Sequence, residues 1–166
     1  RTGAPFVISR TFDAPRELVF AAFTQRKHLE RWMGPQGVTM VNCTVDLRPG
    51  GAFHYGMQMP NGQVMWGQWI FREIAAPERL VVVVHFSDEH GGVTRHPMAT
   101  TWPLHTLSTT TLTEAADGKT LMTLHWQALN ADAVESQTFD GAHAGMAQGW
   151  GGTMNELDKY LAGLQA

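Results

Sequence analysis

Residues 139–162 read FDGAHAGMAQGWGGTMNELDKYLA and carry large side chains at every third or fourth position. The recurring residues are Phe139, His143, Met146, Trp150, Thr153, Leu157, Leu161 and Leu164. This spacing places them on one face of an amphipathic helix about seven turns long. Five glycines interrupt the stretch, and each costs about 1 kcal/mol relative to Ala in a helix. We therefore expect tertiary packing to stabilise this helix, and its glycines to let another element or a ligand approach the backbone.

The residues before this stretch predict two short helices followed by a run of strands. Residues 6–12 alternate apolar and polar side chains, as a half-buried strand does. Asp13 offers an N-cap oxygen and Pro15 a first-turn residue for one helix, and a second helix over 27–33 ends at Gly34-Pro35. Six strands follow, over 38–47, 51–59, 65–74, 80–87, 106–114 and 120–128. Short Gly-, Pro- and Asp-containing turns separate most of them, so successive strands should be antiparallel neighbours.

This order predicts an α+β fold in a single domain that covers residues 1–166. An antiparallel sheet of six to seven strands curls under its own twist, and the long C-terminal helix is the most economical cover for its apolar face. A curved sheet around one helix leaves a gap, and function would be sought there. Segment 88–103 is too long for a simple hairpin, and a lid over the mouth of the gap and a loop docked on the surface both fit it.

Composition excludes several classes of function. Only 16% of the residues are charged, whereas nine Met and six Trp supply large soft or flat side chains. Twelve Lys and Arg against fifteen Asp and Glu leave no basic stripe for nucleic acid. The longest aliphatic run is the five residues 80–84, against about 20 for a spanning helix, so no membrane insertion is expected. A single cysteine, Cys43, and no signal-peptide pattern make the cytoplasm the predicted compartment.

Five stretches resemble the SRPBCC superfamily, whose START-like members share the helix-grip fold. They are FDAPRELVFAAFT (12–24), HLERWMGPQGVT (28–39), DLRPGGAFHY (46–55), REIAAPERLVV (72–82) and the C-terminal stretch quoted above. The chain is most similar to the branch named after the activator of the heat shock protein 90 ATPase, over residues 6–164. The resemblance implies the fold but no single activity, because members include ligand carriers, polyketide cyclase-like enzymes, antibiotic-resistance proteins and chaperone co-factors. Bacterial single-domain members of this branch are mostly of unassigned function.

Inward-facing residues define a candidate ligand cavity. Alternate residues of two neighbouring strands put aromatic and Met side chains on one face, and the helix and segment 88–103 add others. The predicted lining is Phe53, Tyr55, Met57, Trp69, Phe71, His85, Trp102, His143, Met146 and Trp150. A filled core is the alternative for each residue taken alone. Together, the adaptable Met and flat Trp side chains favour a pocket for a hydrophobic or aromatic molecule.

His85, His143 and Tyr55 are the candidates for acid–base chemistry. A buried imidazole with a tunable pKa could protonate or orient a carbonyl ligand. The alternative for each His is a hydrogen-bonded core residue.

A shared metal site on the strand histidines is not expected. His85, His105 and His125 lie on three predicted strands. A two- or three-residue loop at 117–118 pairs His125 with Thr110 or Thr109, roughly 14–17 Å from His105. The three-residue loop is preferred, because it keeps Leu112 and Met122 on the same side. No HExxH, P-loop or GxGxxG pattern occurs either, so no metal or nucleotide cofactor is expected.

These observations favour a binding domain for a small hydrophobic or aromatic molecule rather than an enzyme. One alternative is a cyclase- or hydrolase-like enzyme acting on a polyketide-like substrate. Another is a chaperone ATPase-activator-like module that binds a chaperone, as the family name implies. A homodimer is common among small bacterial domains and is expected here, although no residue demonstrates it.

Overall fold

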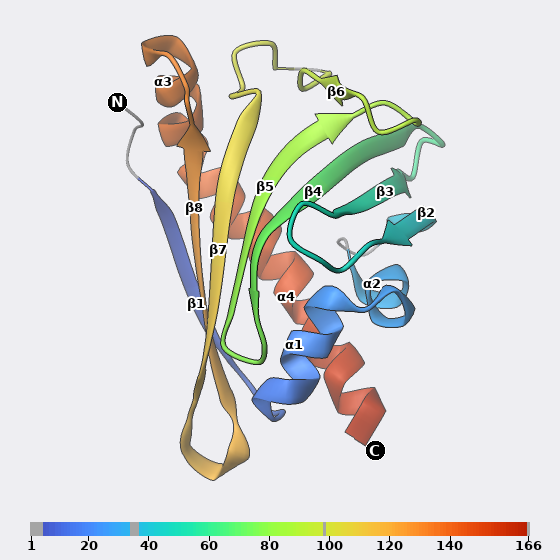
Figure 1. Ribbon diagram of the computed structural model, residues 1–166, viewed down its shortest axis with the longest axis vertical. Helices are drawn as coiled ribbons and strands as arrows, with labels where there is room; N and C mark the ends of the chain where they lie inside the picture. Colours follow the sequence, from blue (N-terminus) through green and yellow to red (C-terminus); the bar gives the residue numbers. More distant parts are fainter. Residues whose placement is uncertain (1–4, 34–36, 98, 166) are drawn as a thin grey trace.

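A curved antiparallel sheet wraps one long helix in the computed structural model, which describes residues 5–33, 37–97 and 99–165 (Figure 1). In chain order the elements are β1 (Phe6–Phe12), α1 (Arg16–Thr24), α2 (Arg26–Trp32), β2 (Thr39–Val45), β3 (Ala52–Gln58), β4 (Val64–Ala75), β5 (Arg79–Ser87), β6 (Val93–Thr94), β7 (His105–Glu114), the 3-10 turn η1 (Ala116–Gly118), β8 (Thr120–Leu129), α3 (Ala133–Gly141) and α4 (His143–Gln165). The sheet order is β1-β8-β7-β5-β4-β3-β2, and the short β6 pairs with β5. The predicted α+β helix-grip fold, with two short helices after the first strand, is confirmed.

Strand register decides which side chains face α4. β7 pairs with β8 so that Thr109 lies opposite His125 and Leu112 opposite Met122, which is the register predicted for a three-residue loop. Leu112 and Met122 are both buried in the core, whereas His125 is exposed. Within the described ranges, no group of three His, Cys, Asp or Glu side chains is placed to hold a metal ion.

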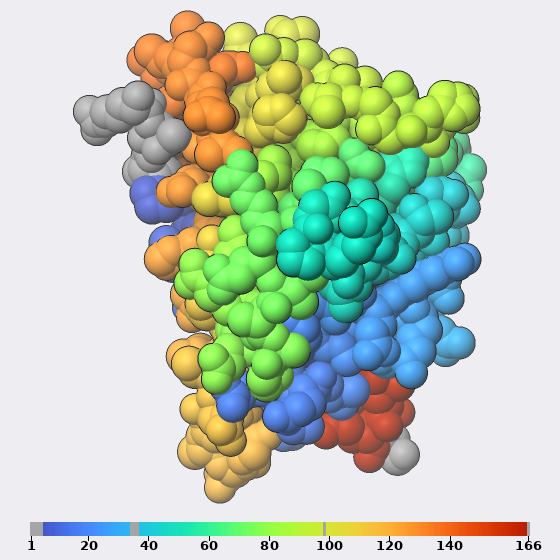
Figure 2. Space-filling model, viewed as in Figure 1, coloured from blue at the N-terminus to red at the C-terminus, as the bar shows by residue number. Residues whose placement is uncertain are grey.

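α4 is packed more tightly at its C-terminal half than at its N-terminal half. Buried apolar side chains form a larger and a smaller cluster. The larger core cluster contains Met154, Leu157 and Leu161 of α4 together with Phe53 and Phe71 of the sheet. In the first half of the helix only Met146 is buried before Thr153 is reached. In Figure 2 the sheet together with α1 and α2 covers most of α4, and the C-terminal end of the helix remains visible beside them. No helix in the described part of the chain is long and apolar enough to cross a membrane.

The C-terminal stretch differs from the single helix predicted from Phe139 onward. α3 ends at Gly141, and the Ala142 N–H bonds back to carbonyls of Phe139 and Asp140, so α4 begins only at His143. α3 starts earlier than the predicted helix because a capping box at Asp132 and Glu135 satisfies its first free N–H groups. Leu164, at the end of the predicted apolar stripe, is 44% exposed.

The start of α1 also differs from the prediction. Its N-cap is Pro15, which makes no side-chain cap, so the prediction of Asp13 as the cap was wrong. The Thr120 hydroxyl instead donates to the Ala14 carbonyl at 2.6 Å, and this bond ties the start of the helix to β8. The second helix, predicted over 27–33, spans Arg26–Trp32; its predicted stop, Gly34-Pro35, lies outside the described residues.

Candidate ligand cavity

A cavity of about 670 Å³ lies between the concave face of the sheet and the first half of α4. Its walls come from β3, β4, β5, β7 and β8, from α1 and the residue after α2, from the end of α3 and the first half of α4, and from segment 88–103. Seven of the residues predicted to line such a space do border it, namely Tyr55, Met57, Trp69, His85, Trp102, Met146 and Trp150. The structure therefore brings side chains together that lie more than 90 residues apart in the sequence.

Phe53, Phe71 and His143 do not border the cavity. The Phe53 and Phe71 rings face inward as predicted but are completely buried in the larger core cluster. His143 packs between the rings of Phe6 and Phe139, at 5.7 Å from each, and its Nε2 is buried with no hydrogen-bond partner in the described chain. Inward orientation alone does not separate these residues from the lining, because core and cavity share the concave face.

Tyr55 lies across the neighbouring strand and faces the cavity beside Trp69. A Cβ atom at Gly67, its partner on β4, would be only 2.4 Å from the Tyr55 hydroxyl, so glycine at this position makes room for the ring. Burial raises the pKa of Tyr55 to about 12, and the hydrogen bond from Trp69 opposes this rise. The phenol therefore stays protonated at neutral pH and is suited to donate a hydrogen bond rather than to act as a base.

His85 borders the cavity, but its ring contacts lie elsewhere. Val84 and Phe86 on either side of it line the cavity, so the alternation of β5 turns the His85 side chain to the opposite face. There its ring meets the His105 ring at 5.5 Å between centroids. Its Nδ1 lies 3.0 Å from the Phe86 carbonyl, which can only accept, so Nδ1 carries the proton.

Several cavity residues were missed by the sequence analysis. They include Phe23 of α1, Met33 after α2, Thr106, Ser108 and Thr110 of β7, Trp126 of β8 and Thr153 of α4, besides aliphatic residues of β5 and glycines of α3 and α4. The signal for the β7 residues lies in the register. Leu112 faces inward, and counting back two residues at a time reaches Thr110, Ser108 and Thr106. Hydroxyl side chains in a strand usually indicate its solvent-exposed face, so these three residues were not predicted to line the cavity.

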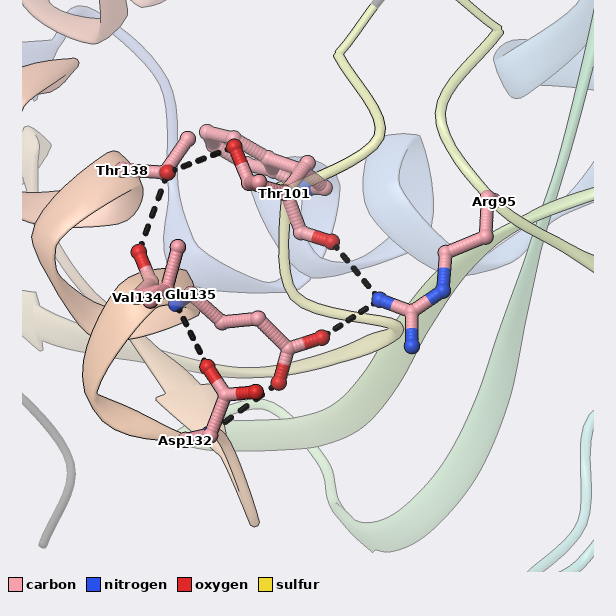
Figure 3. A network of polar contacts seen from close by, with 7 residues as sticks. Arg95, Thr101, Asp132, Val134, Glu135 and Thr138 are labelled. Atoms are coloured by element: carbon pink, nitrogen blue, oxygen red, sulfur yellow. Dashed lines mark hydrogen bonds and ion pairs between the residues drawn. The ribbon is translucent and has the colours of Figure 1, made fainter.

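Polar contacts tie segment 88–103 to α3 (Figure 3). The Arg95 guanidinium pairs with the Glu135 carboxylate and donates to the Trp102 carbonyl at 3.3 Å. The hydrogen bond from Arg95, more than that from the Asp132 N–H, lowers the pKa of Glu135. The hydroxyls of Thr101 and Thr138 lie 2.8 Å apart. These contacts hold the segment where Trp102 borders the cavity.

Stability should fall as the pH drops below about 6.5, the usual pKa of a histidine side chain. Desolvation is the largest cause of the lowered pKa of His28, His96 and His105, below the usual 6.5. Between the lowered pKa and 6.5 the unfolded chain binds more protons than the folded one, so the unfolding free energy rises with pH. This stability is complete above about pH 6.5 and is lost toward the lowered values.

Urea unfolding at several pH values tests this dependence. The His105→Gln variant should show a shallower fall than the unmodified protein, because one of the contributing groups is gone. His125→Gln, at an exposed position of β8, is the control and should leave the slope unchanged. An unfolding free energy that is constant between pH 5 and 7 would contradict the prediction.

Comparison with known proteins agrees with this architecture. The family model described as Activator of Hsp90 ATPase homolog 1-like protein matches residues 13–162. A protein of solved structure from Arthrobacter aurescens is 29% identical, with a TM-score of 0.75 and coverage of 98% of this chain and 91% of that chain. One from Nitrosomonas europaea is 24% identical, with a TM-score of 0.76 and coverage of 97% and 96%.

A more distant relative shares the same fold. The protein named AHSA1 from Silicibacter pomeroyi is 17% identical, with a TM-score of 0.74 and coverage of 98% of this chain and 100% of that chain. No curated protein matches the sequence. Since the family model spans most of the chain, as the resemblance of the sequence implied, this chain belongs to the family of Activator of Hsp90 ATPase homolog 1-like proteins.

Proposed function

We propose that this protein binds a small hydrophobic or aromatic molecule in the cavity between the sheet and α4. The observation that carries the proposal is the cavity itself. Its volume of about 670 Å³ falls within the roughly 300–1,000 Å³ of small-molecule sites. The lining is mostly aromatic and aliphatic, with a few polar groups, which is the composition of such sites.

An apolar space of this size favours occupation by a ligand. An apolar molecule of suitable shape makes dispersion contacts with the aromatic and aliphatic side chains around it. Met57 and Met146 border the space from opposite walls, and their flexible thioethers adapt to ligands of different outline. These features support binding of a ligand class rather than of one rigid shape.

The alternative functions receive less support from the arrangement. For an enzyme acting in this cavity, His143 lies outside the lining and the His85 ring is engaged with His105 and the Phe86 carbonyl. Tyr55 remains as a hydrogen-bond donor, a role that binding also uses. The chaperone partner, the homodimer and the cytoplasmic location concern surfaces and context outside the cavity, and they stay predictions.

Native mass spectrometry of freshly purified protein tests the proposal. We expect a retained small molecule that is released on denaturation, and a saturable rise in melting temperature with added aromatic compounds, because a ligand of the native state raises stability by mass action. The Val84→Phe variant fills the cavity from β5 and should lose both effects. Val7→Phe, at a half-exposed position on β1, is the matched control. Absence of a retained molecule together with absence of any thermal shift in the unmodified protein would contradict the proposal.

A further inference from the structure

The cavity-facing side of β7 is a row of hydroxyl side chains. Thr106, Ser108 and Thr110 alternate along the strand, border the cavity and are 1%, 9% and 8% exposed. The Thr106 hydroxyl donates to the Val84 carbonyl at 3.2 Å. The hydroxyls of Ser108 and Thr110 make no hydrogen bond with any part of the chain that the structure describes. β7 therefore offers the cavity two hydrogen-bonding groups that the described protein leaves unused.

Hydroxyl side chains are not the expected choice for an apolar wall. Val or Ala at these inward positions would add apolar surface, whereas Ser108 and Thr110 place polar groups on the cavity wall, and neither oxygen is among the fully buried side-chain atoms that lack a partner. The neighbouring inward positions of β5, Leu80, Val82 and Val84, are all aliphatic. Two hydroxyls at successive inward positions of one strand, with no partner in the described chain, therefore point to a partner supplied by the ligand.

The opposite wall is a flat stretch of helix backbone. Gly141, at the end of α3, and Gly145 and Gly149 of α4 follow one another at intervals of four residues and border the cavity. A Cβ atom built at any of these glycines meets nothing within 4 Å. No neighbouring side chain therefore requires glycine there, and the absent side chains leave a smooth surface that a planar ring system can approach closely.

Aromatic side chains complete the enclosure. Trp69, Trp126 and Trp150 border the cavity, and the rings of Trp126 and Trp150 meet edge to face at 6.5 Å. Aromatic rings stack favourably on other aromatic rings, in offset or edge-to-face geometry. The walls thus combine flat aromatic surfaces with polar groups, of which the hydroxyls of Ser108 and Thr110 lie at successive inward positions of one strand.

We infer that the cavity takes a planar aromatic molecule with an oxygen acceptor on one edge. The ring system of this molecule lies against Gly141, Gly145 and Gly149, and its oxygen accepts hydrogen bonds from Ser108 and Thr110. This inference rests on the proposed function and narrows it to a ligand class. Apolar stacking supplies the affinity, and the β7 hydroxyls select ligands that carry a carbonyl or similar oxygen. Hydrocarbons of the same shape leave both hydroxyls unpaired and bind more weakly.

A matched pair of probes separates the oxygen from the shape. 2-Acetylnaphthalene and 2-isopropenylnaphthalene have nearly the same outline, with a carbonyl oxygen in one replaced by CH2 in the other. Calorimetric titration of the unmodified protein should give about tenfold tighter binding of the ketone, as expected for one or two neutral hydrogen bonds. The double variant S108A/T110V should bind both probes equally, with the hydrocarbon held at least as tightly as before.

Thr109→Val is the control, because Thr109 lies on the same strand but on the opposite face. It should keep the full preference for the ketone. Circular dichroism and melting curves establish that the double variant folds. Equal binding of the two probes to the unmodified protein, or a preference that survives in S108A/T110V, would overturn the inference and leave the proposed function standing. Failure of both probes to bind the unmodified protein at millimolar concentration would count against the proposed function as well.

Discussion

The Phe71→Ala variant is expected to lose about 3–5 kcal/mol of unfolding free energy. Its ring is completely buried in the core cluster that joins the sheet to Leu157 and Leu161 of α4. The substitution removes the buried apolar surface and leaves a void that close-packed neighbours fill only in part. Since domains of this size are stable by roughly 5–15 kcal/mol, the urea midpoint should fall far below that of the unmodified protein.

Met57→Ala is the matched control for this substitution. Met57 faces inward on β3 but is half-buried and borders the cavity, so its truncation enlarges an existing space rather than opening a new one. We expect a clearly smaller loss of stability and a larger effect on ligand-induced thermal shifts. If the two variants lost the same stability, the division of the inward face into core and cavity would be wrong.

The double variant Gly145→Ala/Gly149→Ala is expected to be more stable than the unmodified protein by about 2 kcal/mol, because Ala is favoured over Gly by about 1 kcal/mol at each helix position. Nothing lies within 4 Å of the added methyl groups, so no clash offsets the gain. The melting temperature should rise by roughly 4–8 °C, given about 2–4 °C per kcal/mol for a chain of this length. Because both methyls stand on the cavity wall, affinity for planar aromatic ligands should fall.

Gly163→Ala separates helix propensity from the cavity wall. Gly163 lies in the last turns of α4, also with nothing within 4 Å of an added Cβ, but it does not border the cavity. It should raise stability without changing ligand affinity. If the double variant at 145 and 149 were less stable than the unmodified protein, the prediction would be wrong. The backbone of α4, and not the cavity, would then be the reason for glycine at these positions.

The order of elements was predictable because it is written in local patterns. Alternation over 6–12, the change to strand period after residue 38 and the return to helical spacing near the C-terminus each follow from which residues share a face. The pairing of Thr109 with His125 was predictable as well, since one turn sets the register of a hairpin. The break at Ala142 was not, because the helical spacing of large residues continues across it.

The sequence predicts which side chains face inward, but it does not predict where the core ends and the cavity begins. Phe53 and Tyr55 point the same way from β3, yet one is completely buried and the other borders the cavity. Alternation gives the direction of a side chain and says nothing of what stands opposite. Ser108 and Thr110 were not predicted to line the cavity for the same reason. Polar side chains on a strand indicate a solvent-exposed face unless the positions of the neighbouring strands and of α4 are known.

The sequence by itself determined the elements, their order and the class of fold, since these depend on spacing, turn residues and the apolar faces of single segments. Only the tertiary structure decided where core ends and cavity begins. That boundary depends on the curvature of the sheet and on how α4 packs against it. Met154, Leu157 and Leu161 fill the space between sheet and helix at one end of α4, whereas glycines border it at the other end. It is therefore a property of distances between elements that no single segment contains.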